Sequence, residues 1–472
     1  MPAIEAPQSE FSKESHTEHL KNIDSPISED LPSLQKQVLR LAWPVIGENL
    51  LETLLGIVDT MLVAGLGTAA IAGVGNGLQI MFFVMSALSA LSIGSSILVA
   101  QAIGAKETQN ASRLARQSLI WSLLLSIPLA FVGFLFSHPL MQLFRTNADV
   151  TKAGVGYMQV TMGTVVVLVA LMIGGGVLRG AGDSRTPMVV TAIANVINGL
   201  LAYGLIYGHW GLPALGAVGS AWATFAARGV ALLLLLGALW QGRNGVSIAG
   251  GKNWRPDWSV AKKVLTLGAP ASVEQILMSL AFLTLTILVA ALGTDTLAAM
   301  RISLTALTFS FLPGMGFSMA ATALVGQSIG AKKPENAYGV AKIATLWAVL
   351  WMGAIGALVL IFAEPIMRRF TGDAEVIKIG AAGLRVVALT QPFWAIGMVQ
   401  SGALRGTGDT RMPLIIGAVS MWSTVALVWL GLTFLHGGLP MVWAAFLITS
   451  PIAALTYAFY VKRVTHPPIN EH

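Results

Sequence analysis

The stretch VAQAIGAK at Val99–Lys106 occurs again 226 residues later as VGQSIGAK at Val325–Lys332. A second stretch repeats at the same distance: RGAGDSRTPM at Arg179–Met188 becomes RGTGDTRMPL at Arg405–Leu414. No insertion or deletion separates these matches. The chain therefore consists of two related halves, which is the pattern of an internal structural repeat.

The composition indicates the environment in which this repeat folds. Of 472 residues, 55% are hydrophobic and only 11% are charged, with a mean hydropathy of +0.73. A soluble domain carries about 25% charged residues. The 50 glycines suit helices that pack closely in lipid. We therefore expect an all-α polytopic membrane protein, and two related halves in such a chain indicate a transporter.

Several other classes of protein are excluded. The chain has no cysteine, its seven histidines lie in the tails and loops, and it contains no GxxxxGK[ST] loop. A membrane enzyme is not expected, because no metal-ligand cluster or nucleophile motif falls at one membrane depth. The sequence pI of about 9.7 does not indicate nucleic-acid binding, because the basic residues are spread over short loops.

The apolar segments number twelve, and each is long enough to cross a bilayer as a helix. They predict two pseudo-symmetric lobes of six helices each. The predicted spans are 38–64, 70–101, 115–139, 155–178, 187–208, 214–240, 260–291, 296–325, 338–363, 379–403, 412–434 and 439–461. The predicted organisation is a disordered cytoplasmic tail (1–33), a first lobe (34–240), a cytoplasmic linker (241–258), a second lobe (259–463) and a C-terminal tail (464–472).

The basic residues predict the orientation. Loops after even-numbered spans are basic, whereas those after spans 1, 5, 7 and 11 carry no Lys or Arg. The positive-inside rule then places both termini in the cytoplasm, in the plasma (inner) membrane. Residues 1–33 hold seven Asp or Glu against two Lys and do not resemble a signal peptide. Because each half has an even number of spans, the symmetry axis is expected to run along the membrane normal.

Three carboxylates fall inside the first span. Glu48, Glu52 and Asp59 share one helical stripe about 16 Å long. A charge at the bilayer centre costs at least ~2.5–3.5 kcal/mol, so acids at this depth are expected to have a functional or structural role. They cannot all stay ionised in a dry site, which predicts a group that takes up and releases a proton or a cation. The alternative is a structural network with Arg228, Arg301 or Arg385.

A fourth acid lies in the second half and is the repeat equivalent of Glu48. Glu274 occupies in the second half the position of Glu48 in the first. The two acids could face each other across a central cleft, or they could reflect inherited helix packing. In the repeated RGxGD loops, Arg179 and Arg405 are interpreted as cytoplasmic loop residues with a structural and gating role.

The chain resembles a known family, the multidrug and toxic compound extrusion (MATE) transporters. The resemblance spans about residues 34–462 and rests on GIVDTMLVAGLGTAAIAG, the duplicated VxQxIGAK and RGxGD stretches, NVING and FLPGMGFSMAATALVGQSIGAKKPENA. It implies two six-helix lobes around a V-shaped cleft. It also implies export of amphipathic, often cationic compounds in exchange for H⁺ or Na⁺.

The resemblance also implies site residues. Asp59 matches the acid of a first-lobe cation or proton site, and Asn198 matches a second member that could hold Na⁺ with it. Ser220 or Thr224 would add a hydroxyl. Many relatives carry a further Asp where this chain has Ala202, so we expect Glu48 or Glu52 to replace that charge.

Together these features predict a secondary active multidrug efflux antiporter that works by alternating access. We expect no cofactor beyond H⁺ or Na⁺ as coupling ion, small organic and mostly cationic substrates, contact with membrane lipids, no nucleic-acid partner, and a monomer. The alternative is a lipid or lipid-linked oligosaccharide flippase of the same superfamily.

Overall fold

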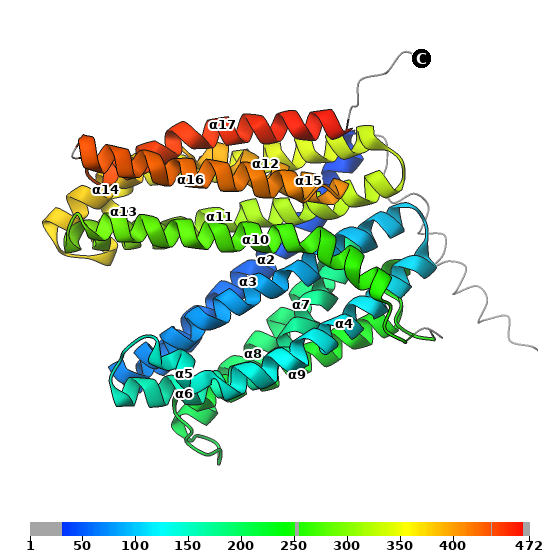
Figure 1. Ribbon diagram of the computed structural model, residues 1–472, viewed down its shortest axis with the longest axis horizontal. Coiled ribbons are helices and arrows are strands. Elements are labelled where there is room, and N and C mark those ends of the chain that lie inside the picture. The colour runs from blue at the N-terminus through cyan, green and yellow to red at the C-terminus, as the bar shows by residue number, and fades with distance from the viewer. Residues whose placement is uncertain (1–30, 251–253, 436, 466–472) are drawn as a thin grey trace, which may run out of the picture.

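The computed structural model describes residues 31–250, 254–435 and 437–465, and within these ranges the chain forms helices and no strand (Figure 1). The helices of the first half are α2 (Leu31–Ala64), α3 (Thr68–Gly104), α4 (Thr108–Leu135), α5 (Ser137–Gln142), α6 (Ala148–Gly163), α7 (Val165–Gly180), α8 (Arg185–Tyr207) and α9 (Ala217–Trp240). A short 3₁₀ turn, η1 (Arg243–Gly245), follows. Those of the second half are α10 (Trp258–Ala290), α11 (Thr294–Gly330), α12 (Pro334–Ile361), α13 (Ala363–Phe370), α14 (Ala374–Ala388), α15 (Gln391–Thr407), α16 (Arg411–Phe434) and α17 (Leu439–Thr465).

The predicted fold class is confirmed, with one refinement. Ten helices of the described chain are long and apolar enough to span a membrane, and two bent pairs, α6 with α7 and α14 with α15, raise the number to as many as twelve. Each pair bends by 51°. The breaks lie at the repeat-equivalent residues Thr164 and Thr390, whose hydroxyls donate to the carbonyls of Val160 (2.7 Å) and Val387 (2.6 Å). These hydroxyls compete with backbone N–H groups for helix carbonyls, and this competition favours a bend.

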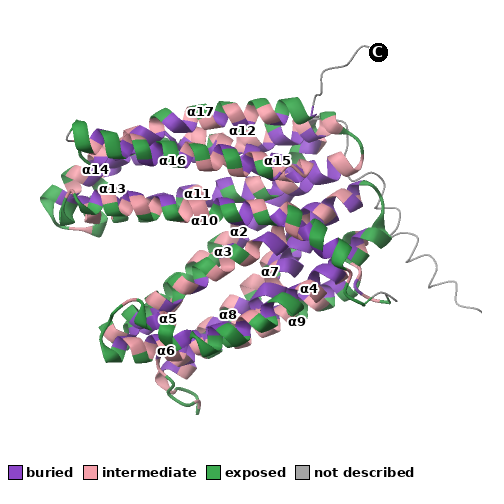
Figure 2. Cartoon of the chain, viewed as in Figure 1, coloured by how far each residue is buried: buried purple, intermediate pink, exposed green. Residues whose placement is uncertain are grey.

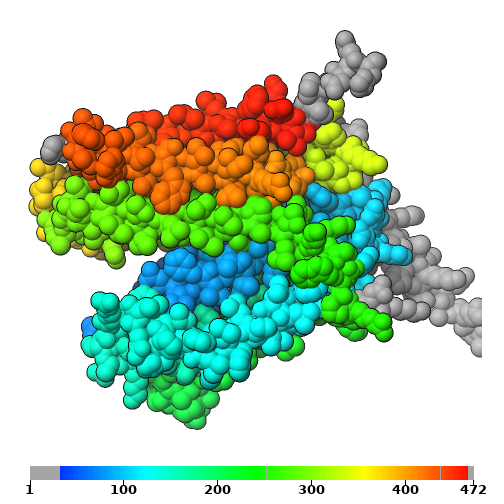
Figure 3. All heavy atoms as spheres, viewed as in Figure 1, coloured from blue at the N-terminus to red at the C-terminus, as the bar shows by residue number. Residues whose placement is uncertain are grey.

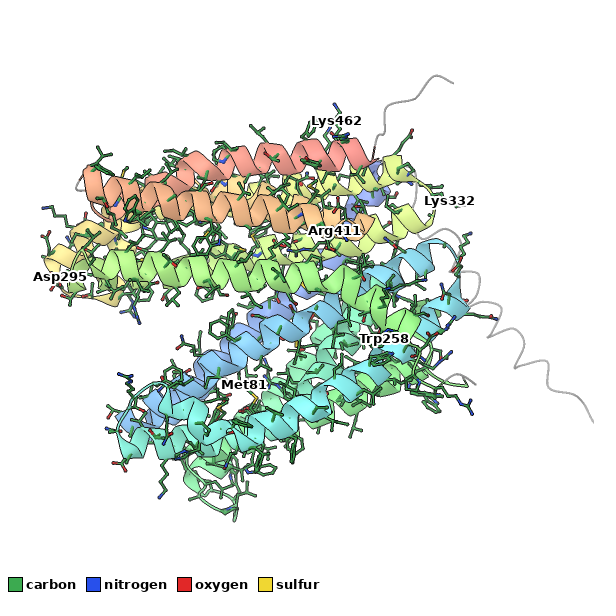
Figure 4. The ribbon with its side chains drawn as sticks, viewed as in Figure 1. Met81, Trp258, Asp295, Lys332, Arg411 and Lys462 are labelled. Atoms are coloured by element: carbon green, nitrogen blue, oxygen red, sulfur yellow. The ribbon has the colours of Figure 1, made fainter. Side chains whose placement is uncertain are left out.

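The two halves of this multi-pass membrane protein form the arms of a V. In Figures 1 and 3 the two groups of helices meet at one end and part toward the other, where α5, α6, α13 and α14 lie. Figure 4 places Lys332, Arg411 and Lys462 at the closed end and Asp295 at the open end. The space between the arms is therefore accessible from the end opposite the basic loops.

The long helices α2 and α10 cross from one arm to the other. The start of α2 packs through Leu34 and Val38 into the apolar core of the second half. Its repeat counterpart α10 reciprocates, since Val260 and Val264 belong to the core of the first half. Figure 2 shows buried residues concentrated inside each arm and where the arms meet. The predicted lobe boundaries at residues 34 and 259 remain a prediction, but the packing of each lobe includes a segment of the other.

The repeated VxQxIGAK stretches close the narrow end. Gln101 donates from Nε2 to the carbonyl of Gly406 (3.2 Å), and Gln327 donates from Nε2 to the carbonyl of Gly180 (2.9 Å). Each bond joins one half to the other, and the two bonds are equivalent under the 226-residue repeat. The stretch that identified the repeat is thus also the contact between its copies.

Two glycines allow this contact. A Cβ added at Gly104 would overlap the carbonyl of Gln327, and one at Gly330 would overlap the carbonyl of Gln101. Helix backbones can approach this closely only where the residue has no side chain. The sequence IGAK therefore requires its glycine at both positions.

Replacing either of these glycines by alanine is expected to lower the free energy of unfolding by about 1–3 kcal/mol, the usual cost of overpacking. Gly75→Ala on the same helix α3 is the matched control, because a Cβ there meets nothing within 4 Å. Thermal unfolding in detergent measures the difference. Equal midpoints for Gly104→Ala and Gly75→Ala would contradict this packing.

The linker between the halves is docked against α4. Val246 and Ile248 are buried in the first-half core. Gln117 donates to the carbonyl of Arg255 (2.7 Å) and accepts from the backbone N–H of Asp257 (2.8 Å). Asp257 also forms an ion pair with Arg113. The described part of the linker therefore fixes the start of α10 relative to α4.

Asp257 gives this connection a dependence on pH. The Ser259 hydroxyl and the Arg113 guanidinium stabilise its carboxylate and lower its pKa to about 2. A lowered pKa stabilises the folded state above the ordinary value of 3.8, and this contribution is lost as the pH falls toward 2. Asp257→Asn should therefore lower the thermal midpoint at pH 7, and its difference from wild type should narrow below pH 4. Asp295→Asn, at an exposed site, should show no such narrowing.

Candidate ion-coupling site

A polar cluster lies within the first arm, among helices that are otherwise apolar. Asn198 of α8 donates from Nδ2 to the hydroxyl of Thr224 on α9 (3.0 Å), and Thr224 donates to the carbonyl of Ser220 (3.0 Å). All three residues are buried. The apolar wall beside them includes Val63 of α2 and Ala202 of α8. The structure thus brings together the amide and both hydroxyl residues that the family resemblance singles out.

Asp59 of α2 faces this cluster. It lies close enough to Thr224 and Arg228 to interact with both, and Tyr157 of α6 is within electrostatic range of the same acid and arginine. Among the described residues, Oδ1 of Asp59 and Oδ1 of Asn198 are buried without a hydrogen-bond donor. Unsatisfied buried acceptors are costly. Two such oxygens around one hydroxyl suit a hard cation or an added proton.

Glu48 is held differently. Its two carboxylate oxygens accept from Nη1 of Arg179, each at 3.0 Å. In the second half, Glu274 accepts from Nη2 of Arg405 at 2.7 Å. Acids and arginines alike are related by the 226-residue repeat, so one buried ion pair occurs in each arm. It joins α2 to α7 in the first and α10 to α15 in the second.

These ion pairs correct one expectation and bear on a question that the sequence left open. Arg179 and Arg405 were expected to be loop residues, but they lie in the last turn of α7 and α15 and reach inward to a carboxylate. For Glu48 and Glu274, the sequence left open whether they face each other across a cleft or reflect inherited helix packing. Each is buried and bound to the arginine of its own half, because an isolated charge in the membrane needs a partner.

The three arginines of the structural alternative differ in their surroundings. Arg301 and Arg385 are exposed, and within the described ranges neither they nor Arg228 form an ion pair. Arg228 is within electrostatic range of both Asp59 and Glu52. It therefore belongs to the candidate site, whereas the other two do not.

Glu52 lies on α2 between Glu48, which is paired with Arg179, and Asp59, which is near Arg228. Its side chain is exposed, and it is within electrostatic range of Glu48, Arg179 and Arg228. The acidic stripe of α2 thus consists of a paired acid, an exposed acid and a half-buried acid near the polar cluster. Only the first has an ion-pair partner among the residues described.

The second arm has no charged counterpart of this cluster. The positions equivalent to Glu52, Asp59, Asn198, Thr224 and Arg228 are Met278, Leu285, Thr424, Ser450 and Ala454. Leu285 is fully buried in an apolar core. The repeat therefore duplicates the scaffold and the buried ion pair, while charged groups at the cluster occur in the first half alone.

Sequence reasoning missed the contacts of three residues. Arg179 and Arg405 had a usable signal, because the acids and the arginines recur at one common distance, and a paired recurrence indicates contact. The predicted spans ended one or two residues before them. Tyr157, which is buried beside Asp59, had no signal in a single sequence.

Comparison with known proteins places this geometry among transporters. The MatE family profile matches residues 44–204 and 270–430, which are the two repeats. A probable multidrug resistance protein NorM of Thermotoga maritima is 32% identical over 84% of this chain and 85% of its own. The multidrug resistance protein NorM of Burkholderia vietnamiensis is 28% identical over 83% and 86%.

Solved structures show the same fold. An outward-facing multidrug resistance MATE family transporter superposes with a TM-score of 0.85 at 23% identity, covering 93% of this chain and 99% of the other. A transporter of the MOP superfamily from Pyrococcus furiosus gives a TM-score of 0.84 at 23% identity, with the same coverage.

Proposed function

The chain belongs to the MatE family of multidrug and toxic compound extrusion transporters, and from that premise we propose that it is a secondary active antiporter. It exports amphipathic organic compounds, mostly cations, in exchange for H⁺ or Na⁺. It works as a monomer in the plasma (inner) membrane, with both termini in the cytoplasm. The relatives named for multidrug resistance support this substrate class.

The observation that carries the proposal is the pair of buried acceptors in the first arm. Oδ1 of Asp59 and Oδ1 of Asn198 have no donor within the described chain, and Thr224, which accepts from Asn198, lies close enough to interact with Asp59 as well. A coupling ion or a proton on Asp59 would satisfy these oxygens. Releasing it leaves a carboxylate that must be solvated or paired again, so occupation changes the local free energy substantially.

Occupation of this site can bias the conformation of the arms. The cluster draws on α2, α6, α8 and α9, and α2 also packs into the second arm. A ligand shifts a conformational equilibrium only by its differential affinity for the two states. We propose that H⁺ or Na⁺ at Asp59 stabilises one state, and that movement of α2 transmits the change to the other arm.

The arrangement of the arms supports an outward-open state. The positive-inside rule assigns the closed end, with Lys332, Arg411 and Lys462, to the cytoplasm (Figure 4). The arms then part toward the outside. Glu52 is exposed on α2, and a carboxylate at that position would favour cationic over anionic substrates.

The test is transport by purified protein in liposomes loaded with a fluorescent cationic dye. A pH gradient and a Na⁺ gradient are imposed separately and dye movement is followed. We expect one gradient to drive movement against the dye gradient. No movement under either gradient, with folded protein shown by gel filtration, would contradict antiport of this substrate class. Gradient-independent movement of a fluorescent lipid between leaflets would support the flippase instead.

A further inference from the structure

A basic groove lies along the start of α2, the helix that carries the acids of the first arm further along its length. It has a volume of about 550 Å³ and runs along the start of α2 as far as Pro44, with Arg185 of α8 on its other side. Lys36, Arg40 and Arg185 line it and are exposed. None of the three forms an ion pair with a described residue.

The acid nearest in sequence to Arg185 is already engaged. Asp183 accepts from the backbone N–H groups of Arg185 and Thr186 and from the Thr186 hydroxyl at the start of α8. The lining contributed by the described chain contains no acid. The groove therefore gathers three positive charges that no described residue neutralises, which favours an anionic occupant.

The other end of the groove is aromatic. Trp43 lines it, is 47% exposed, and packs edge-on against Trp351 of α12 with ring centroids 5.4 Å apart. Trp351 is also 39% exposed. Partly exposed tryptophans on a membrane protein mark the level of the lipid headgroups. From Pro32 to Pro44 the helix rises about 18 Å, enough to hold a phosphate at one end and the first carbons of an acyl chain at the other.

We propose that this groove binds an anionic phospholipid, with its phosphate among Lys36, Arg40 and Arg185 and its glycerol and upper acyl carbons against Trp43. Basic pockets between transmembrane helices at the membrane surface bind anionic headgroups in this manner. Trp43 and Trp351 favour a lipid over a free anion, because inorganic phosphate gains nothing from an aromatic wall.

The repeat provides a natural control. The positions equivalent to Lys36 and Arg185 are Lys262, near the start of α10, and Arg411, at the start of α16, so two of the three cations recur in the second half of the sequence. Arg40 and Trp43 are replaced there by Thr266 and Ala269. The second half thus keeps two of these charges, but its positions equivalent to Arg40 and Trp43 carry neither a cation nor an aromatic ring.

The experiment titrates the full-length protein, in neutral detergent, into acyl-labelled fluorescent phosphatidylglycerol and follows anisotropy. Unlabelled phosphatidylglycerol should compete, whereas phosphatidylcholine of equal chain length and inorganic phosphate should not. Lys36→Gln/Arg185→Gln should weaken binding by roughly 25-fold, about fivefold for each cation. Lys262→Gln/Arg411→Gln should leave it within about twofold. Arg40→Thr/Trp43→Ala, which installs the residues of the second arm, should weaken it as well.

Several outcomes would overturn the proposal. Equal competition by phosphatidylcholine would show a lack of headgroup recognition. An equal loss of lipid affinity in the two double glutamine variants would show non-specific charge attraction. Competition by inorganic phosphate would identify a free-anion site. Binding that appears only in Glu29→Gln/Asp30→Asn would identify the acidic N-terminal segment of the chain as the occupant. Because all substituted groove residues are exposed, gel filtration should show every variant folded.

Discussion

Replacing Asp59 by asparagine is expected to reduce gradient-driven dye movement to the level of protein-free liposomes. Asparagine has nearly the same shape, but it can neither release a proton nor neutralise a cation. The side chain beside Asn198 and Thr224 would then be neutral in every state of the cycle. No ion gradient could therefore shift the equilibrium between the two conformations through this site. Dye movement under an imposed gradient measures the effect.

The control for this prediction is Asp295→Asn at the open end (Figure 4). Asp295 is exposed at the start of α11, far in sequence from the first-arm site, and its replacement removes the same charge. It should transport dye as wild type does. Normal coupling in Asp59→Asn, or equal loss in the two variants, would reject Asp59 as the coupling residue.

The second large effect is expected on stability. Arg405→Met would leave Glu274 buried in α10 without its guanidinium, since the Nη2–Oε2 ion pair at 2.7 Å is the one that the carboxylate forms in the described structure. Breaking a buried ion pair by removing one partner costs about 3–5 kcal/mol. We therefore expect a clear fall in the thermal midpoint of the purified protein, larger than for the exposed-site variant Arg411→Gln.

The double variant tests the reason for this loss. Glu274→Met/Arg405→Met removes both charges and replaces them by apolar groups, which is often neutral or stabilising. It should recover most of the stability that Arg405→Met loses. The same comparison at Glu48 and Arg179 should give the same ranking, since this pair is also largely buried. A double variant as unstable as the single would show that packing of the arginine stem, and not charge compensation, is responsible.

The repeat explains why so much of the fold could be predicted. The 226-residue distance and the apolar segments predicted two related arms and the spanning helices, although the predicted starts of α2, α4 and α6 lie seven residues too late. They did not predict the bends at Thr164 and Thr390. The first break has no proline beside it, and Pro392 at the start of α15, a usable signal for the second, has no counterpart in the first half. The apolar segments also could not predict that Leu34 and Val38 pack in the second arm, since an apolar stripe does not specify its neighbour.

The site was predictable in part for similar physical reasons. Glu48, Glu52 and Asp59 stood out because charge inside an apolar helix is rare. Their different surroundings depend on tertiary packing: Arg179 reaches Glu48, while Asp59 lies near Thr224 and Arg228. Helix ends are uncertain by two to four residues from sequence alone. An error of this size was enough to assign Arg179 to a loop.

The most direct test of the account is ion counterflow driven by the substrate itself. Liposomes containing the protein and internal indicators for pH and Na⁺ receive a gradient of cationic dye and no ion gradient. The account predicts that dye movement drives H⁺ or Na⁺ in the opposite direction with wild type and Asp295→Asn, and drives neither ion with Asp59→Asn. Dye movement without any ion counterflow in wild type, or unchanged counterflow in Asp59→Asn, would contradict it.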